Sequence, residues 1–334
     1  MSGFSLSPCH TNVKTDMSDP IDVVYTWVDD SFAGYSDTLQ AHADDPRDAS
    51  PNRTRDNLET LRYSLRSLER FAPFVRRVHL LTCRPQVPAW LDTARDDIRV
   101  VHHDEIMDPA ILPTFSSFAI VSHLSKLPDL SERFLYFEDD MLAFAPLKAA
   151  DFMTSDGRAR MFMRRKHAPV RDKVDPGRSS PWDLALATAN EALDRAHGKE
   201  RRNYLAHGPI LIDRAVFDDM LETFPREIDA TRRARFRADG TIPPEYVYPQ
   251  HALKTGRAER ASLAEVHRMA GYASLENILP WTVFQLRRLE WRKPCTITLN
   301  DSFGTAPNPR VVAHVRKTLE KWFPTPSRFE RRDF

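Results

Sequence analysis

Cysteine is scarce in this sequence, and no stretch is apolar enough to suggest a membrane segment. The 334 residues contain three cysteines, Cys9, Cys83 and Cys295, and no Cys-x-x-Cys pair. This spacing argues against a zinc site and a disulfide framework, and it favours a reducing compartment. The polar N-terminus lacks the apolar segment of a secretory signal, and no run approaches the roughly 18 apolar residues of a membrane span. We therefore predict a cytoplasmic protein, either free or peripheral to the inner face of the membrane.

Glycine and an excess of either charge are also lacking. The ten glycines form neither a GxxxxGK[ST] nor a GxGxxG motif, which excludes a P-loop and a dinucleotide fingerprint. The 48 basic residues nearly balance the 47 acidic ones, for a net charge of +1, so bulk nucleic-acid binding is not expected. If the protein binds phosphates, we expect arginines, helix N-termini and a metal ion to hold them.

Apolar runs alternate with helical patterns through the first 150 residues. The runs that predict strands are 21–28, 76–83, 98–102 and 133–141. Leucines recur at helical spacing from Leu58 to Leu68, and Asp56 with Glu59 resembles a capping box at the start of that helix. Residues 116–127 predict a second helix. This alternation is typical of an α/β fold with a mainly parallel sheet.

The remainder of the chain is less regular. We interpret residues 1–19 as a flexible tail and residues 29–53 as a polar loop. Residues 156–181 are rich in Arg, Lys, Pro, Gly and Ser, which predicts an irregular excursion and a candidate lid over a site. A short strand is predicted at 297–299. Further helices are predicted at 183–196, 213–223, 246–255, 275–290 and 310–322. We predict one domain over residues 20–330.

Acidic side chains follow two of the predicted strands. Glu138, Asp139 and Asp140 come at the end of one apolar strand, and Asn300 and Asp301 follow the short strand near the C-terminus. In α/β sheets, ligands bind beyond the carboxyl ends of the strands. Clustered carboxylates repel one another unless a cation lies between them, and their oxygens suit Mg²⁺ or Mn²⁺. The alternatives are a solvated acidic turn and, for the Asn-Asp pair, an Asx turn or helix cap.

One histidine and two groups of arginines are further candidates. His207 lies in a rigid His-Gly-Pro context and could transfer a proton or donate to an oxyanion, although most single histidines are structural. Guanidinium groups pair well with phosphate oxygens, and the alternative is a solvated charged face. The arginines are Arg53, Arg55, Arg62 and Arg66 around the first helix, and Arg232, Arg233, Arg235 and Arg237 in a later segment.

Taken together, four ordered blocks of this sequence resemble the Stealth family of sugar-phosphate transferases. They span nearly the whole chain, from about residue 21 to residue 330. The blocks are IDVVYTWVDDS at 21–31, the segments 55–92 and 116–141, AHGPILIDR at 206–214 with the arginines up to 237, and TLNDSFG at 298–304 with FPTPSRFE near the end.

The resemblance implies a fold, a reaction and particular residues. The fold is α/β, with a sheet core similar to nucleotide-diphosphate-sugar transferases and a helical elaboration, in a single catalytic domain. The donor is a nucleotide sugar of the UDP type, and hexose-1-phosphate passes to a carbohydrate hydroxyl with release of the nucleoside monophosphate, in capsular or exopolysaccharide synthesis. By position, Asp139 and Asp140 match the acidic pair, His207 the histidine of the third block, Arg237 a phosphate-facing arginine and Asp301 the aspartate of the fourth block.

These implications lead to specific assignments. Charge neutralisation at the diphosphate calls for a metal ion and arginines. We assign the metal, Mg²⁺ or Mn²⁺, to Asp140 and Asp301 with Asn300 as a further ligand, and the general base to Asp139 or His207. The predicted donor-binding residues are Tyr25, Trp27, Asp29, Arg55, Asn57, Arg62 and Arg235.

Alternatives stay open at this point. Tyr25 and Trp27 could stack on the nucleotide base or pack in the core. One competing function is a conventional metal-dependent glycosyltransferase that releases the nucleoside diphosphate. Another is a carbohydrate-binding protein without activity, against which the combined set of acids, histidine and arginines argues. The sugar, the acceptor and the oligomeric state do not follow from the sequence.

Overall fold

The central element of the fold is a five-stranded sheet in the order β3-β2-β1-β4-β9. The computed structural model describes residues 20–45, 48 and 54–334, so the predicted tail at 1–19 and Arg53 lie outside the described residues. The four neighbours β3, β2, β1 and β4 are parallel, and β9 is antiparallel to β4. The strands are β1 Ile21–Thr26, β2 Val75–Thr82, β3 Ile98–His102, β4 Arg133–Glu138 and β9 Ile210–Asp213. The predicted α/β fold with a mainly parallel sheet is confirmed.

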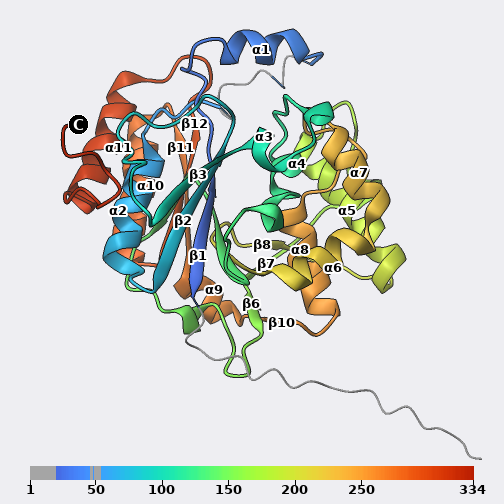
Figure 1. The fold of residues 1–334 in the computed structure, drawn as a ribbon. Helices are drawn as coiled ribbons and strands as arrows, with labels where there is room; N and C mark the ends of the chain where they lie inside the picture. The colour runs from blue at the N-terminus through green and yellow to red at the C-terminus, as the bar shows by residue number, and fades with distance from the viewer. Residues whose placement is uncertain (1–19, 46–47, 49–53) are drawn as a thin grey trace, which may run out of the picture.

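The two middle strands of this sheet are buried on both faces. Val23 and Val24 of β1, which point to opposite faces, have no exposed surface, and the same holds for Phe134 and Leu135 of β4. Such burial requires helices on both sides, as is usual for parallel strands. Figure 1 shows α2 on one side and α4, α6 and α8 on the other. These helices are α2 Thr60–Phe71, α4 Ser117–Val121, α6 Arg214–Thr223 and α8 Pro244–Lys254.

A second, three-stranded sheet carries the C-terminal part of the chain. Its order is β11-β12-β5, from Ala270–Glu276, Thr296–Ser302 and Met141–Ala143, and it packs against α10 (Leu279–Arg292) and α11 (Pro309–Trp322). Because β5 follows β4 almost directly, β12 is brought to the end of β4, where the backbone N–H of Leu299 donates to the carbonyl of Asp140 at 2.9 Å. Gly271 is needed in β11, since a Cβ there would lie 2.5 Å from Pro294 Cγ.

Of the remaining elements, α5 and α7 form a helical region with α4, α6 and α8, while α9, β6 and β10 lie below the central sheet (Figure 1). The helices are α3 His103–Ile106, α5 Pro181–His197, α7 Pro225–Arg233 and α9 Leu263–Met269. The short strands are β6 Ala159–Met161, β7 Met163–His167, β8 Asn203–Leu205 and β10 Ala258–Arg260. This helical elaboration was expected from the resemblance. Within the part of the chain that the structure describes, no helix has the length and apolarity to cross a bilayer.

Several local predictions are wrong. The predicted loop at 29–53 contains α1 (Tyr35–His42). The segment 156–181 contains strands β6 and β7 rather than only irregular chain. That this segment forms a lid stays a prediction. The helix predicted at 275–290 is present as α10, but it begins only at Leu279, because the chain up to Glu276 forms strand β11, which pairs with β12. Helix α2 begins at Thr60, because the preceding Glu59 has a φ of 55°, which is not helical. The predicted capping box of Asp56 and Glu59 therefore does not form. Instead, Oδ1 of Asp56 accepts a hydrogen bond from the backbone N–H of Thr60 at 3.2 Å.

Candidate active site

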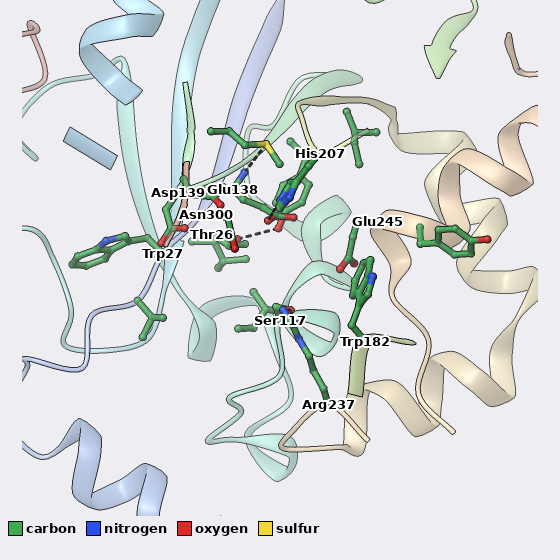
Figure 2. A pocket seen from close by; sticks show the side chains of 18 of the residues that line it. Thr26, Trp27, Ser117, Glu138, Asp139, Trp182, His207, Arg237, Glu245 and Asn300 are labelled. Carbon is green, nitrogen blue, oxygen red and sulfur yellow. Dashed lines mark hydrogen bonds and ion pairs between the residues drawn. The ribbon is translucent and has the colours of Figure 1, made fainter. Parts of the chain in front are cut away.

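A cavity lies where the strand order of the central sheet reverses. From β1 the chain proceeds to β2 and β3 on one side and returns to β4 on the other, so the loops after β1 and β4 diverge. Such a switch point, outside the carboxyl ends of parallel strands, is the usual ligand site of α/β sheets. A cavity of about 520 Å³ opens there, lined by Thr26 and Trp27 after β1 and by Glu138, Asp139 and Asp140 after β4 (Figure 2). The acids predicted from the sequence therefore do lie at a cavity.

Elements that are remote in sequence supply the other walls of this cavity. β7 contributes Arg164, and the start of α5 contributes Trp182. His207 comes from the loop between β8 and β9, and Glu245 comes from the first turn of α8. Arg237 and Asn300 also line the cavity.

His207 and the first acid of the cluster form an ion pair. Nε2 of His207 lies 2.9 Å from Oε2 of Glu138, and both side chains keep about a third of their surface exposed (32% and 35%). Burial lowers the pKa of His207, but the charge of Glu138 and the hydrogen bond to it outweigh burial and raise that pKa to about 9. Burial raises the pKa of Glu138, and the neighbouring His207 lowers it below its usual range. The imidazole therefore carries a proton at neutral pH in this arrangement.

Negative charge is unfavourable on the other two acids of the cluster, Asp139 and Asp140. Burial, with the charges of Asp140 and Asp56, raises the pKa of Asp139 well above its usual range. Burial and the charge of Glu138 raise the pKa of Asp140 to about 7, although His207 lowers it. Oδ1 of Asp140 is buried and has no hydrogen-bond partner among the described residues. These shifts indicate a site that lacks a positive charge.

The cluster suits a divalent cation. One ligand atom each from Glu138, Asp140 and His207 lies within 4.8 Å of the other two, and because a protonated imidazole cannot coordinate a metal, the two carboxylates are the candidate ligands. The orphaned Asp140 oxygen and the adjacent Glu138 carboxylate are the hard donors that Mg²⁺ and Mn²⁺ prefer, and such carboxylates are commonly held by a further hydrogen-bond donor. Asn300 lines the same cavity. The residues present therefore fit the predicted metal.

The predicted metal ligand Asp301 has a different immediate partner. Its Oδ2 accepts a hydrogen bond from Nδ2 of Asn57 at 3.0 Å, and burial raises its pKa. Its charge still contributes to the raised pKa values of Asp139 and Asp140, so it lies near the cluster. The structure thus adds Glu138, which we did not assign to the metal, to the candidate ligands.

Arg237 reaches the cavity, and Arg235 does not line it. The guanidinium of Arg237 donates to Oγ of Ser117 at 2.6 Å and lies 4.7 Å from the centre of the Phe118 ring. Arg235 contributes its carbonyl oxygen to a hydrogen bond from Phe115. Nearby Arg232 is held by Ser122 inside the helical region. Only one arginine of this segment is therefore a ligand candidate in the cavity.

The two aromatic side chains of the first strand have different roles. Trp27 lines the cavity, and its indole N–H donates to Oδ2 of Asp56 at 3.3 Å. Tyr25 has no exposed surface, and its hydroxyl lies 2.6 Å from Oγ of Ser64. Tyr25 lies within β1 and packs in the core against Phe137, whereas Trp27 follows the end of the strand. The prediction of Tyr25 as a donor-binding residue is wrong, whereas Trp27 remains a candidate.

Arginines of the first helix stabilise the C-terminus instead of a phosphate. Arg62 Nε lies 2.6 Å from Oε2 of Glu330. Arg66 binds the same carboxylate with two hydrogen bonds of 2.8 Å, and a third goes to Glu320 at 3.0 Å. Burial raises the pKa of Glu330, but the hydrogen bonds from Arg66 and from the Ser327 backbone outweigh it and lower that pKa to about 2. Arg62 is thus a structural residue, contrary to our assignment.

Two predicted donor-binding residues lie away from the main cavity. Asp29 shapes the turn after β1: its carboxylate accepts hydrogen bonds from the backbone and hydroxyl of Ser31, and its backbone pairs with Gln86. Arg55 binds Asp30 at 2.9 Å and lines a separate cavity of about 210 Å³. Neither side chain lines the cavity that holds the acid cluster.

Glu245 and Trp182 are among the cavity residues that the sequence interpretation missed. They come from α8 and α5, respectively. The signal for Glu245 was present but weak: it is an acid in the first turn of a helix whose residues 244–252 are all buried. An acid in such an apolar setting is rarely buried without a functional or structural partner.

Comparison with known proteins identifies the class. The model of Stealth protein conserved region 2 matches residues 53–161, and the model of Stealth protein conserved region 3 matches residues 206–252. The first segment holds the acid cluster, and the second holds His207, Arg237 and Glu245. The chain belongs to the Stealth family of proteins.

Curated relatives match along almost the full length of the chain. An exopolysaccharide phosphotransferase of Streptomyces coelicolor is 34% identical, over 98% of this chain and 55% of that protein. The capsular polysaccharide phosphotransferase SacB of Neisseria meningitidis serogroup A is 29% identical, over 95% of this chain and 58% of that protein. This chain thus spans a little more than half the length of these relatives.

Solved structures with overall similarity are sugar transferases. The galactosyltransferase LgtC, in complex with donor and acceptor sugar analogs, is 12% identical and covers 91% of this chain and 97% of its own, with a TM-score of 0.41. Mouse xyloside xylosyltransferase 1 is 11% identical, over 84% of this chain and 97% of its own, with a TM-score of 0.39. The fold assignment rests on the sheet topology described above.

Proposed function

We propose that the chain transfers a hexose-1-phosphate from a nucleotide sugar, of the UDP type, to a carbohydrate hydroxyl in the synthesis of a capsular or extracellular polysaccharide. The observation that carries this proposal is the convergence of the acid cluster, His207 and Arg237 on one cavity at the sheet's switch point. The phosphotransferase names of the relatives support the same reaction. A nucleotide diphosphate needs positive charge and hydrogen-bond donors, and this cavity offers both.

In the proposed reaction the acceptor oxygen attacks the sugar-linked phosphorus. A new oxygen–phosphorus bond forms, the bond from this phosphorus to the bridging oxygen breaks, and the nucleoside monophosphate leaves with the electron pair. The hydroxyl proton passes to a carboxylate. Asp139 is the candidate base, because it lines the cavity beside the cluster, and the positive charge of a bound metal would favour its deprotonated form.

His207 and Arg237 act on the phosphate oxygens in this proposal. The protonated His207, held by Glu138, donates to an oxygen of the transferring phosphoryl group. Arg237, held by Ser117, offers its remaining N–H groups to the same diphosphate. Mg²⁺ or Mn²⁺, held by Asp140 and Glu138 with Asn300 beside them and Asp301 near them, would neutralise diphosphate charge when bound.

The released nucleotide tests the proposal. Incubation with UDP-glucose or UDP-N-acetylglucosamine and an oligosaccharide acceptor should release UMP, and the ³¹P spectrum of the product should show a phosphodiester. Release of UDP with a phosphorus-free product would support the conventional glycosyltransferase instead. Binding of saccharides without any turnover of a panel of nucleotide sugars would support the non-catalytic alternative.

A further inference from the structure

A carboxylate that the proposed reaction does not use faces the same cavity. Glu245, in the first turn of α8, is 8% exposed, and its Oε2 has no hydrogen-bond partner among the described residues. Burial, together with the charge of Glu138, raises its pKa to about 7. A buried acceptor without a partner costs stability, so its presence in a cavity wall calls for a ligand that satisfies it.

The surroundings of Glu245 define the chemistry of that ligand. In Figure 2, Glu245 lies on the same side of the cavity as Trp182, away from Trp27. The indole of Trp182 is partly exposed and packs against Phe118 at 5.7 Å between ring centres. This part of the cavity therefore combines an aromatic face with a hydrogen-bond acceptor.

An anionic ligand does not fit beside Glu245. A second negative charge in direct contact with Glu245, in addition to Glu138, would raise the electrostatic cost. Burial raises the pKa of Glu245, whereas the charges of Arg237 and His207 lower it, so both cations lie near it, and they are the groups proposed to hold the diphosphate. A neutral group that donates hydrogen bonds suits an unpaired carboxylate, and an aromatic ring suits an apolar face of the same ligand. A pyranose ring has both features, with hydroxyl donors at its edge and C–H groups on its faces.

We propose that Glu245 and Trp182 form a saccharide subsite, in which the carboxylate accepts hydrogen bonds from ring hydroxyls and the indole packs against the ring. This inference rests on the proposed function and extends it, because it names the residues that recognise a sugar. The ring belongs either to the transferred hexose or to the acceptor. The transferred hexose and the acceptor sugar present the same hydroxyl groups and ring faces to a protein. The experiment below therefore has separate arms for the two.

Binding measurements without turnover provide the test. Wild type, Glu245→Gln and Trp182→Ala are titrated with UDP, UDP-glucose and UDP-N-acetylglucosamine in Mg²⁺ by calorimetry. Methyl glucoside and methyl N-acetylglucosaminide are then added to the UDP-loaded proteins in saturation-transfer NMR. Glu222→Gln, on the exposed side of α6, is the matched control, since it removes the same charge far from the subsite.

Each outcome has a defined meaning. If the subsite holds the donor sugar, both variants bind the UDP-sugars about tenfold more weakly and bind UDP as wild type does. If it holds the acceptor, all nucleotide affinities stay normal and the glycoside signals are lost. Unchanged binding in every arm, or an equal loss for UDP itself, would overturn the proposal.

Folding and the reaction are checked separately. Glu245→Gln removes an unpaired buried charge, so its thermal midpoint at pH 8 should equal or exceed that of wild type. Should it fail to fold, Trp182→Ala carries the test alone. Release of UDP instead of UMP in a turnover assay would refute the proposed reaction and leave the saccharide subsite standing, because the binding arms need no turnover.

Discussion

Nε2 of His207 and Oε2 of Glu138 lie 2.9 Å apart, although 69 positions separate the two residues in the sequence. The contact joins the end of β4 to the loop before β9, and it keeps the imidazole protonated because the carboxylate raises the pKa of His207 to about 9. A histidine in this state is a hydrogen-bond donor at neutral pH. In the proposed reaction His207 therefore acts as a hydrogen-bond donor, which leaves Asp139 as the candidate general base.

Replacement of His207 tests this role. We expect His207→Ala to lower the turnover number roughly 100-fold, equal to about 2.7 kcal/mol, with little change in donor affinity, because the interaction strengthens in the transition state. His267→Ala, on the exposed side of α9, is the control. Steady-state kinetics with the donor varied give both quantities, and an unchanged turnover number would remove the histidine from the mechanism.

The metal assignment predicts unequal effects of two aspartates. Asp140→Asn should abolish Mn²⁺ binding, followed by electron paramagnetic resonance, and should lower turnover roughly 100-fold or more. Asp301→Asn should weaken Mn²⁺ binding less, because Asp301 is engaged by Asn57. Excess EDTA should abolish turnover of the wild type. Equal Mn²⁺ affinity in wild type and Asp140→Asn would refute this assignment.

Tyr25, in β1, and Trp27, just after β1, allow a matched comparison at the donor site. Trp27→Ala should weaken UDP binding about tenfold, or 1.4 kcal/mol, since Trp27 lines the cavity. Tyr25→Phe should leave UDP affinity unchanged and cost about 1 kcal/mol of unfolding free energy, because it removes only the buried hydrogen bond with Ser64. Calorimetry and urea unfolding measure the two effects. The opposite pattern would restore Tyr25 as the nucleotide contact.

The carboxylate of Glu330 should control stability and not activity. Glu330→Gln leaves Arg66 without its buried counter-charge, so we expect a loss of about 3 kcal/mol or more of unfolding free energy at pH 7. Because folding lowers the pKa of Glu330 from 4.5 to about 2, its contribution is complete above pH 4.5 and disappears as the pH falls through about 2. Urea unfolding at pH 7 and pH 2.5 should show the difference between wild type and variant shrinking. Glu222→Gln should change neither value.

Sequence and structure agree most closely on the central sheet. β1, β2 and β4 were predicted because strands buried on both faces are nearly continuous apolar runs. The acid cluster was predicted to lie at a ligand site because it follows such a strand, and ligands bind beyond the carboxyl ends of strands in α/β sheets. Helix α1 and strand β11 were missed, because α1 has a single buried leucine and β11 is stabilised by pairing with β12, which no local pattern reveals.

Local sequence determined the strands, the leucine-rich helix and the kinds of side chain available for chemistry. Tertiary structure decided which of those side chains share the cavity. Arg62 and Arg237 carry the same guanidinium group, but Glu330, 268 positions away, pairs with the first, while Ser117 holds the second at the cavity wall. Glu245 likewise became a candidate only when α8 placed it in the wall of the same cavity, with no hydrogen-bond partner for its Oε2 among the described residues. The physical reason is that charge and hydrogen-bonding capacity belong to a residue, whereas its partners and its burial depend on chain segments that only folding brings together.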